Sequence, residues 1–248
     1  MPHYENAPIT EALIDIRADL APEVRYEDLQ AFRQHFAPDY PREETRSVGE
    51  ALLQFGAAVH ASAKQTPLGL AFWNSSNNQV VQVRLDGFTF SRLHPYEDFE
   101  HLRDEARRLW NIYREVVRSR KVTRVAVRYI NQFNIPITPG TSIEPEDYFY
   151  TFPQVSKNLP TEMRYFGPYL MSLRLFQHDL KGILVLNQAM TPPSLPETIS
   201  IVLDFDLYIE NPPVTNEQQL WAVFDRLRER KNLYFEACIT DKARELIR

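Results

Sequence analysis

The chain has 248 residues, of which 44% are hydrophobic and 12% aromatic, so it can bury a core and is not a disordered chain. Its 28 lysines and arginines are outnumbered by 33 aspartates and glutamates, and the resulting net charge of −5 argues against a general nucleic-acid binder. Residues 1–6 do not resemble a signal peptide, no apolar run approaches the roughly 20 residues that span a bilayer, and Cys238 is the only cysteine, so we expect a cytoplasmic protein.

The first half of the chain begins with an alternating pattern. Residues 11–20 place apolar side chains at the even positions and mostly polar ones at the odd positions, which predicts a strand with one buried face. Residues 26–36 predict a short helix. Three more strands are expected after this helix, at 45–60, 68–74 and 81–86. Residues 96–118 then carry apolar side chains three or four positions apart, a spacing typical of an amphipathic helix.

The second half shows the same order of elements. Residues 121–135 alternate between two faces and predict a long strand, and 144–151 predict a short helix. Three further strands are expected, at 169–177, 182–190 and 199–208. The last element is a predicted helix over 216–247, with a bend near Asn232 or at 239–240.

This repeated order predicts the fold. Each half, about 1–120 and about 121–248, follows the order strand, helix, three strands, long helix. We therefore expect one α+β domain in which two fused, pseudo-twofold halves form a single curved antiparallel sheet of about eight strands. The long helices should pack on the convex face, giving a saddle or half-barrel similar in outline to the TATA-binding-protein or helix-grip architectures. Residues 118–121 form a short polar turn rather than a flexible linker, which favours a single domain.

Several short motifs are spread along the chain. They are Tyr4-x-Asn6-Ala7-Pro8-Ile9-x-Glu11-Ala12, Pro95-Tyr96, Arg128-Tyr129-Ile130-Asn131, Ile135-Pro136, Asp147-Tyr148-Phe149 and Phe235-x-x-x-Ile239-Thr240-Asp241. Together they resemble the motifs of a sporadically distributed prokaryotic family of unknown function, and the resemblance covers nearly the whole chain. It implies membership of that family and no particular activity. A sporadic distribution suits an accessory or defence-associated role.

The polar faces of the predicted strands carry charges of both signs. If the apolar faces lie under the helices, the opposite faces bring together five arginines and six acids: Arg17, Arg84, Arg124, Arg128, Arg174, Glu11, Asp15, Asp19, Asp86, Asp204 and Asp206. A surface that follows phosphates would be mostly basic, and this one is balanced. It is either a lattice of cross-strand ion pairs or a polar groove for a ligand. The candidate ligand-binding residues are Arg128, Arg174, Arg84, Asp204, Asp206 and Glu11.

Arg128 is the most informative of these candidates. It lies in the middle of a predicted strand, and its planar guanidinium suits a carboxylate or a phosphate. The structural interpretation pairs it with Asp204 or Asp206 on a neighbouring strand. Those two carboxylates lie about 7 Å apart along a strand, so with a third acid they could also hold a divalent cation.

The sequence contains no catalytic or cofactor signature. It has no glycine-rich dinucleotide or phosphate loop and no Gly-x-Ser-x-Gly motif, so we predict no cofactor and no metal. The leading hypothesis is a non-enzymatic module that binds a protein or small molecule through the polar sheet face. The alternatives are a metal-dependent enzyme acting on a phosphorylated or nucleotide substrate and a nucleic-acid-binding saddle. The strand edges at the two ends of an open sheet could also pair to form a homodimer.

Overall fold

A computed structural model describes residues 4–54, 60–118, 121–137, 143–164 and 167–248. Among these residues nine strands form one antiparallel sheet: β1 Ile9–Asp19, β2 Arg42–Gln54, β3 His60–Trp73, β4 Gln79–Arg84, β5 Gly87–Leu93, β6 Lys121–Pro136, β7 Leu170–Gln177, β8 Gly182–Thr191 and β9 Thr198–Glu210. The α-helices are α1 Phe32–Phe36, α2 Phe99–Val117, α3 Glu217–Cys238 and α4 Asp241–Glu245. Single 3₁₀ turns lie at Tyr26–Ala31, Pro145–Asp147 and Thr161–Met163.

The sheet is open, and its strand order is β2-β3-β4-β5-β1-β6-β9-β8-β7. The strands that begin the two predicted halves, β1 and β6, therefore lie side by side at its centre. The predicted α+β class and the single antiparallel sheet are confirmed. None of the helices formed by the described residues is both long and apolar enough to cross a lipid bilayer.

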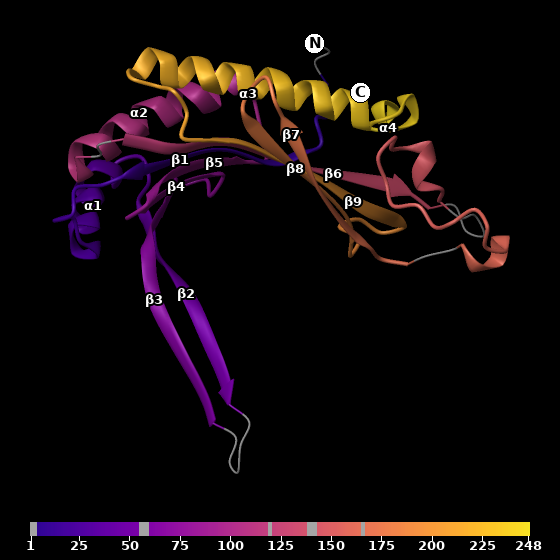
Figure 1. Ribbon diagram of the computed structural model, residues 1–248, viewed down its shortest axis with the longest axis horizontal. Helices are drawn as coiled ribbons and strands as arrows, with labels where there is room; N and C mark the ends of the chain where they lie inside the picture. The colour runs from indigo at the N-terminus through magenta and orange to yellow at the C-terminus, as the bar shows by residue number, and fades with distance from the viewer. Residues whose placement is uncertain (1–3, 55–59, 119–120, 138–142, 165–166) are drawn as a thin grey trace.

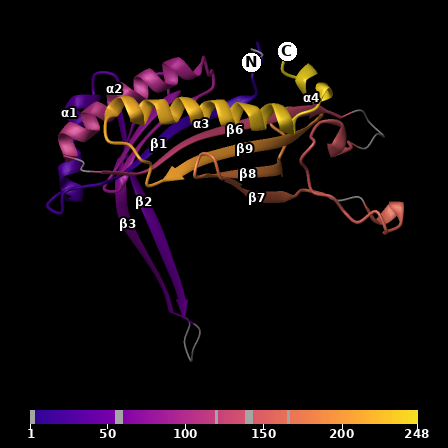
Figure 2. The same cartoon turned by 45° about the horizontal axis from the view of Figure 1, so that its top comes forward.

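The core lies between one face of this sheet and the two long helices. Ala12, Ile14 and Ile16 of β1 are fully buried on that face, as the alternating pattern predicts. Helix α2 packs over β5 and β1, and α3 packs over β6 and β9, so both helices cover the same face (Figures 1 and 2). The opposite face of the central strands is left without a helix.

Each long helix begins at a residue that caps it. The side chain of Asp98 accepts a hydrogen bond from the backbone N–H of His101 at the start of α2, and Asn216 does the same for Gln219 at the start of α3. Helix α3 ends at Cys238, and Thr240 caps α4. Of the two predicted bends, the break at 239–240 is therefore correct, and Asn232 lies inside a continuous helix.

The first half contains one strand more than the sequence predicts. The chain turns at Leu85-Asp86 and returns as β5, whose first residue, Gly87, pairs with Arg84. Gly87 has φ +155°, and a Cβ there would lie 2.3 Å from the carbonyl oxygen of Ile16, so the turn requires glycine. The helix predicted at 144–151 is wrong in length, because only the single turn Pro145–Asp147 forms.

A long hairpin extends from one end of the sheet. Strand β3 pairs with β4 only over Gly69–Trp73, so the outer parts of β2 and β3 pair with each other alone and project away from the sheet (Figure 1). The strand predicted at 45–60 corresponds to β2 as far as Gln54, and residues 55–59 of that prediction lie outside the described residues. Strand β7 forms the other edge, where Leu170 and Phe176 are 76% and 68% exposed.

Candidate functional site

The polar sheet face is organised around Asp15, which is 6% exposed. Its two carboxylate oxygens accept hydrogen bonds from Arg84 Nη2 at 2.9 Å, Arg124 Nη1 at 2.8 Å and Thr89 Oγ1 at 2.7 Å. Burial alone would raise the pKa of Asp15, but Arg84, Thr89, Arg17 and Arg124 together lower it below its ordinary value. The carboxylate is therefore ionised, and both of its oxygens accept hydrogen bonds from neighbouring side chains.

Arg128 pairs with Asp204. Its Nε and Nη2 atoms each donate to a different oxygen of Asp204 at 2.8 Å, and Asn187 Nδ2 donates to the same carboxylate at 3.0 Å. The predicted structural pairing is confirmed, with Asp204 as the partner rather than Asp206. Asp206 instead lies 3.4 Å from Arg124. Burial raises the pKa of Asp206, and the like charges of Asp204 and Asp15 add to this rise, while Arg124 and Arg128 oppose it.

The remaining candidates are Arg174 and Glu11. Arg174 is exposed on β7, where its Nη2 atom donates to the hydroxyl of Tyr208 at 3.0 Å. Glu11 lines a shallow hollow of about 430 Å³, together with Arg84 and Trp73, near the base of the β2–β3 hairpin. Four of the six predicted residues thus belong to two ion-pair networks, Glu11 lies beside Arg84 in the hollow, and Arg174 lies apart.

The carboxylates of this face do not form a cation site. Within the described parts of the chain, no group of three or more His, Cys, Asp and Glu side chains is arranged to hold a metal ion. Asp15, Asp204 and Asp206 each lie against an arginine instead. The polar face is therefore a lattice of ion pairs in which opposite charges satisfy one another.

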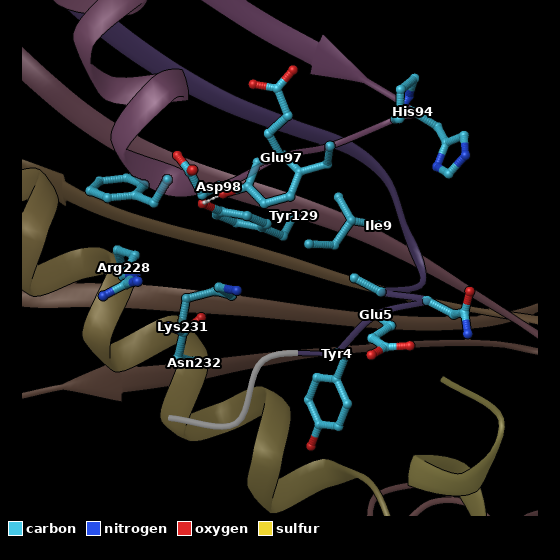
Figure 3. Close-up of a pocket in the computed structure, with 15 residues that line it drawn as sticks. Tyr4, Glu5, Ile9, His94, Glu97, Asp98, Tyr129, Arg228, Lys231 and Asn232 are labelled. Carbon is cyan, nitrogen blue, oxygen red and sulfur yellow. Dashed lines mark hydrogen bonds between the residues drawn. The ribbon is translucent and has the colours of Figure 1, made fainter. Parts of the chain in front are cut away.

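A different region holds a buried charge that pairs with no acid of the described residues. A pocket of about 510 Å³ opens between the N-terminal segment, the turn from β5 into α2, strand β6 and helix α3 (Figure 3). Residues 4–7 and Ile9 line one side, and residues 94–99 line another. Tyr129 of β6 forms the floor, and Arg228, Lys231 and Asn232 reach in from α3. The sequence pattern does not predict this pocket.

Lys231 is the unusual residue of the pocket. It is only 6% exposed, and its side chain runs from α3 toward the space beside Tyr129 and Ile9 (Figure 3). Its Nζ atom lies 3.8 Å from the centroid of the Tyr129 ring and 5.9 Å from that of Phe235. No acceptor atom of the described residues makes a hydrogen bond or ion pair with it. Its contacts are thus aromatic faces, which attract a cation weakly compared with a carboxylate.

The electrostatics of the pocket follow from this burial. Loss of water, followed by the like charge of Arg228, lowers the pKa of Lys231 to about 7, and the charge of Glu236 acts in the opposite direction. Two of the three acids that line the pocket have partners. Asp98 caps α2 and contacts the ring of His101, and Glu97 pairs with Arg92. Glu5 lines the pocket as well, but none of these three acids pairs with Lys231, so its ammonium is available to an anionic group of a ligand.

Two tyrosine hydroxyls meet beside the lysine. The hydroxyl oxygens of Tyr96 and Tyr129 lie 3.1 Å apart, and burial raises the pKa of both, so both stay protonated at neutral pH. Only one of the two protons is needed for the bond between them. The other is free to be donated to an oxygen atom of a bound molecule.

Segments from both ends of the chain close the pocket wall. The hydroxyl of Tyr4 donates to Glu236 at 2.9 Å. The backbone N–H of Asn6 donates to the carbonyl of Ile247, and its side chain donates to the carbonyl of Arg248 at 2.5 Å. Three of the motifs described above, the opening segment, Pro95-Tyr96 and the one that contains Tyr129, meet at this pocket.

Two other motifs serve the fold. The segment 147–149 lies against 239–241 through a bridge between Phe149 and Ile239 and a hydrogen bond from Thr240 Oγ1 to the carbonyl of Asp147.

In comparisons with protein-family models, curated proteins and solved structures, no match to this chain was found. The family resemblance stays a prediction, and the candidate site rests on the geometry of the pocket.

Proposed function

We propose that the protein is a binding module whose ligand is a small organic anion held in the pocket around Lys231. The ligand carries a carboxylate or phosphate and an apolar part that fits against the aromatic walls. The observation that supports this proposal is the buried ammonium group without an acidic partner. It favours the pocket over the polar sheet face, where arginines and acids pair with one another, as the binding site.

Binding of an anion would offset the free-energy cost of burying Lys231. A buried charge without a partner costs several kcal/mol, and a bound anion would remove much of that cost. The pocket volume of about 510 Å³ falls within the range of small-molecule sites. Arg228, with 37% of its side chain exposed and its nearest acid, Glu100, 3.9 Å away, can supply a second contact to the anion.

Calorimetric titration tests this proposal. The wild-type protein is titrated with benzoate, pyruvate and glycerol phosphate, and at least one of them should bind. The Lys231→Met variant should lose that binding. The matched control is Lys242→Met, which removes an exposed lysine that pairs with Asp147 at 2.7 Å and should leave binding unchanged. Equal binding by both variants, or none by the wild type, would reject the proposal.

The two alternative functions depend on the polar sheet face. A metal-dependent enzyme for a phosphorylated substrate would need free carboxylates, and Asp15 and Asp204 are held by arginines. Stabilisation by Mg²⁺ or Mn²⁺ with a nucleotide in a thermal-shift screen would favour it. A nucleic-acid-binding saddle would give a mobility shift at physiological salt.

A cytoplasmic location, which suits the single buried Cys238, remains part of the main proposal.

We also propose that the fold arose by duplication. Matching β1, β3, β4, β5 and α2 with β6, β7, β8, β9 and α3 makes the strand order symmetric about the β1–β6 pair, and only β2 lacks a counterpart. The saddle outline with helices on its convex face belongs to the same proposal. Superposing one set on the other tests it, because a duplication requires a single rotation near a half-turn, and any other relation contradicts it.

A homodimer is the partner arrangement that we propose for the exposed edge. Strand β7 presents unpaired backbone groups together with the exposed Leu170 and Phe176. A second copy of β7, added antiparallel about a twofold axis, would satisfy both edges with identical contacts. Light scattering should then give a dimer for the wild type and a monomer for Phe176→Lys. A monomeric wild type would exclude this arrangement.

A further inference from the structure

Lys231 differs chemically from an ordinary ion-pairing lysine. Lys242 shows the ordinary case, since its ammonium lies 2.7 Å from a carboxylate oxygen of Asp147 at the surface. Lys231 has no acid within hydrogen-bonding distance among the described residues, and its Nζ atom faces a pocket large enough for a small molecule. A second cation, Arg228, lies one helical turn away. Desolvation and a neighbouring cation are the two conditions that turn a lysine amine into a nucleophile.

We propose that Lys231 forms an imine with the carbonyl carbon of a small ligand that carries both a carbonyl group and a carboxylate. This inference deepens the proposed function and rests on it, because the carboxylate is the anion that the pocket binds. It adds a covalent step at Nζ. Arg228 is placed to hold the carboxylate, so the carbonyl group of a short 2-oxo acid would lie near the amine.

The chemistry needs no further reactant. The lone pair of the unprotonated Nζ attacks the carbonyl carbon, and the π electrons of the C=O bond move to oxygen. A proton passes from nitrogen to that oxygen and gives a carbinolamine. The nitrogen lone pair then forms the C=N bond while the C–O bond breaks, and the oxygen leaves as water with a second proton from the Tyr96–Tyr129 hydroxyl pair. The nitrogen of the resulting iminium returns its proton to that pair, which leaves the neutral imine. No atom is oxidised or reduced.

The surroundings favour both stages of this reaction. Burial and Arg228 keep much of the amine unprotonated at neutral pH, since the pKa of Lys231 is lowered to about 7. The other charged or titratable groups that face the pocket are Tyr4, Glu5, His94, Tyr96, Glu97, Asp98 and Tyr129, with Glu236 farther along α3. The spare hydroxyl proton of the Tyr96–Tyr129 pair can be donated to the oxygen of the ligand.

Reductive trapping tests the proposal on the unmodified protein. The full chain is incubated with pyruvate and sodium cyanoborohydride, digested, and mapped by mass spectrometry. An unprotonated amine at neutral pH should make Lys231 acquire the reduced adduct at least ~10-fold faster than Lys242, the internal control. Lys231→Arg, which keeps the charge but cannot form an imine, should give no adduct at position 231.

Titration with lactate separates this inference from the binding proposal, because lactate keeps the carboxylate but has no carbonyl group. If lactate and pyruvate bind equally and no adduct forms at Lys231, the imine is rejected and the binding site stands. If neither binds and none is trapped, the imine is rejected, and the binding proposal fails as well only if benzoate and glycerol phosphate also do not bind. Adducts spread evenly over all lysines would reject the imine as well, because the reaction would then show no effect of the pocket.

Discussion

The two charged regions of this molecule satisfy their charges in opposite ways. On the polar sheet face, Asp15 is buried and three arginines and a threonine donate to it. In the pocket, Lys231 is equally buried, yet aromatic rings are its closest partners. The first arrangement stabilises the native state, and the second costs stability unless a ligand compensates for it. A buried charge therefore indicates a binding site only where its counter-charge is missing.

The largest expected effect is at the centre of the ion-pair lattice. Asp15→Asn leaves Arg84 and Arg124 facing a neutral group, and Arg84 has only 12% of its side chain exposed. The free energy of unfolding at neutral pH should fall by about 3–4 kcal/mol, measured by urea denaturation. The control is Asp86→Asn in the same network, where the side chain is 58% exposed and the loss should stay under about 1 kcal/mol.

The same substitution should change the response to acid. The pKa of Asp15 is lowered in the folded protein, so its contribution is complete above its ordinary pKa and is lost as the pH falls below it. The wild type should therefore lose stability more steeply than Asp15→Asn below about pH 4. Parallel curves for the two proteins would contradict the role given to Asp15.

The second effect has the opposite sign. Lys231→Met replaces the unpaired ammonium with an apolar chain, so it should raise the free energy of unfolding by about 2–4 kcal/mol near pH 6. Below a pKa of about 7 the lysine is charged in both the folded and the unfolded state, and its burial penalty is largest. As the pH rises from about 7 to 10, the folded lysine is already neutral, so the penalty and the gain both shrink. A gain that does not depend on pH would show that Lys231 is not a buried base.

A smaller loss is expected at the second ion pair. Arg128→Leu leaves Asp204 with Asn187 as its remaining donor, and the carboxylate is only 8% exposed. The free energy of unfolding, measured by urea denaturation, should fall by about 1–3 kcal/mol, and adding Asp204→Asn should recover part of this loss. A variant that melts like the wild type but loses biological activity would instead make Arg128 a ligand-binding residue.

The smallest effect belongs to Arg174. Its side chain is exposed on an edge strand and donates one hydrogen bond to Tyr208. Arg174→Leu should change the free energy of unfolding by less than about 0.5 kcal/mol and leave anion binding unchanged. A loss of binding measured by calorimetry would move the ligand site from the pocket back to the sheet face.

Sequence patterns predict most of this fold because alternation and helical spacing are strong signals. The strand predicted at 121–135 forms as β6 over Lys121–Pro136, and the helix predicted at 96–118 forms as α2 over Phe99–Val117. Strand β5 is absent from the prediction because the strand expected at 81–86 runs into the Leu85-Asp86 turn and no element is expected between residue 86 and the helix at 96. The choice of Asp204 over Asp206 as the partner of Arg128 depends on side-chain direction across paired strands, which one sequence does not contain.

The pocket was missed for a related reason. Its walls come from segments far apart in the chain, and only the fold brings them together. One local signal was present. Lys231 follows Phe224 and Leu227 and precedes Phe235 in the buried stripe of α3, so a charged residue occupies a core position. Such an interruption is the sequence feature that would have pointed to the site.

The contacts of Asn6 with Ile247 and Arg248 also affect how the molecule is made. They join positions more than two hundred residues apart, so this wall of the pocket forms by closing a very long loop. During synthesis the sheet and α2 can begin to fold while the later residues are still inside the ribosome, but the contacts of the opening segment with Glu236 and with residues 247–248 form only after those residues emerge. This wall of the pocket therefore forms after α3 has been synthesised, later than the first strands of the sheet.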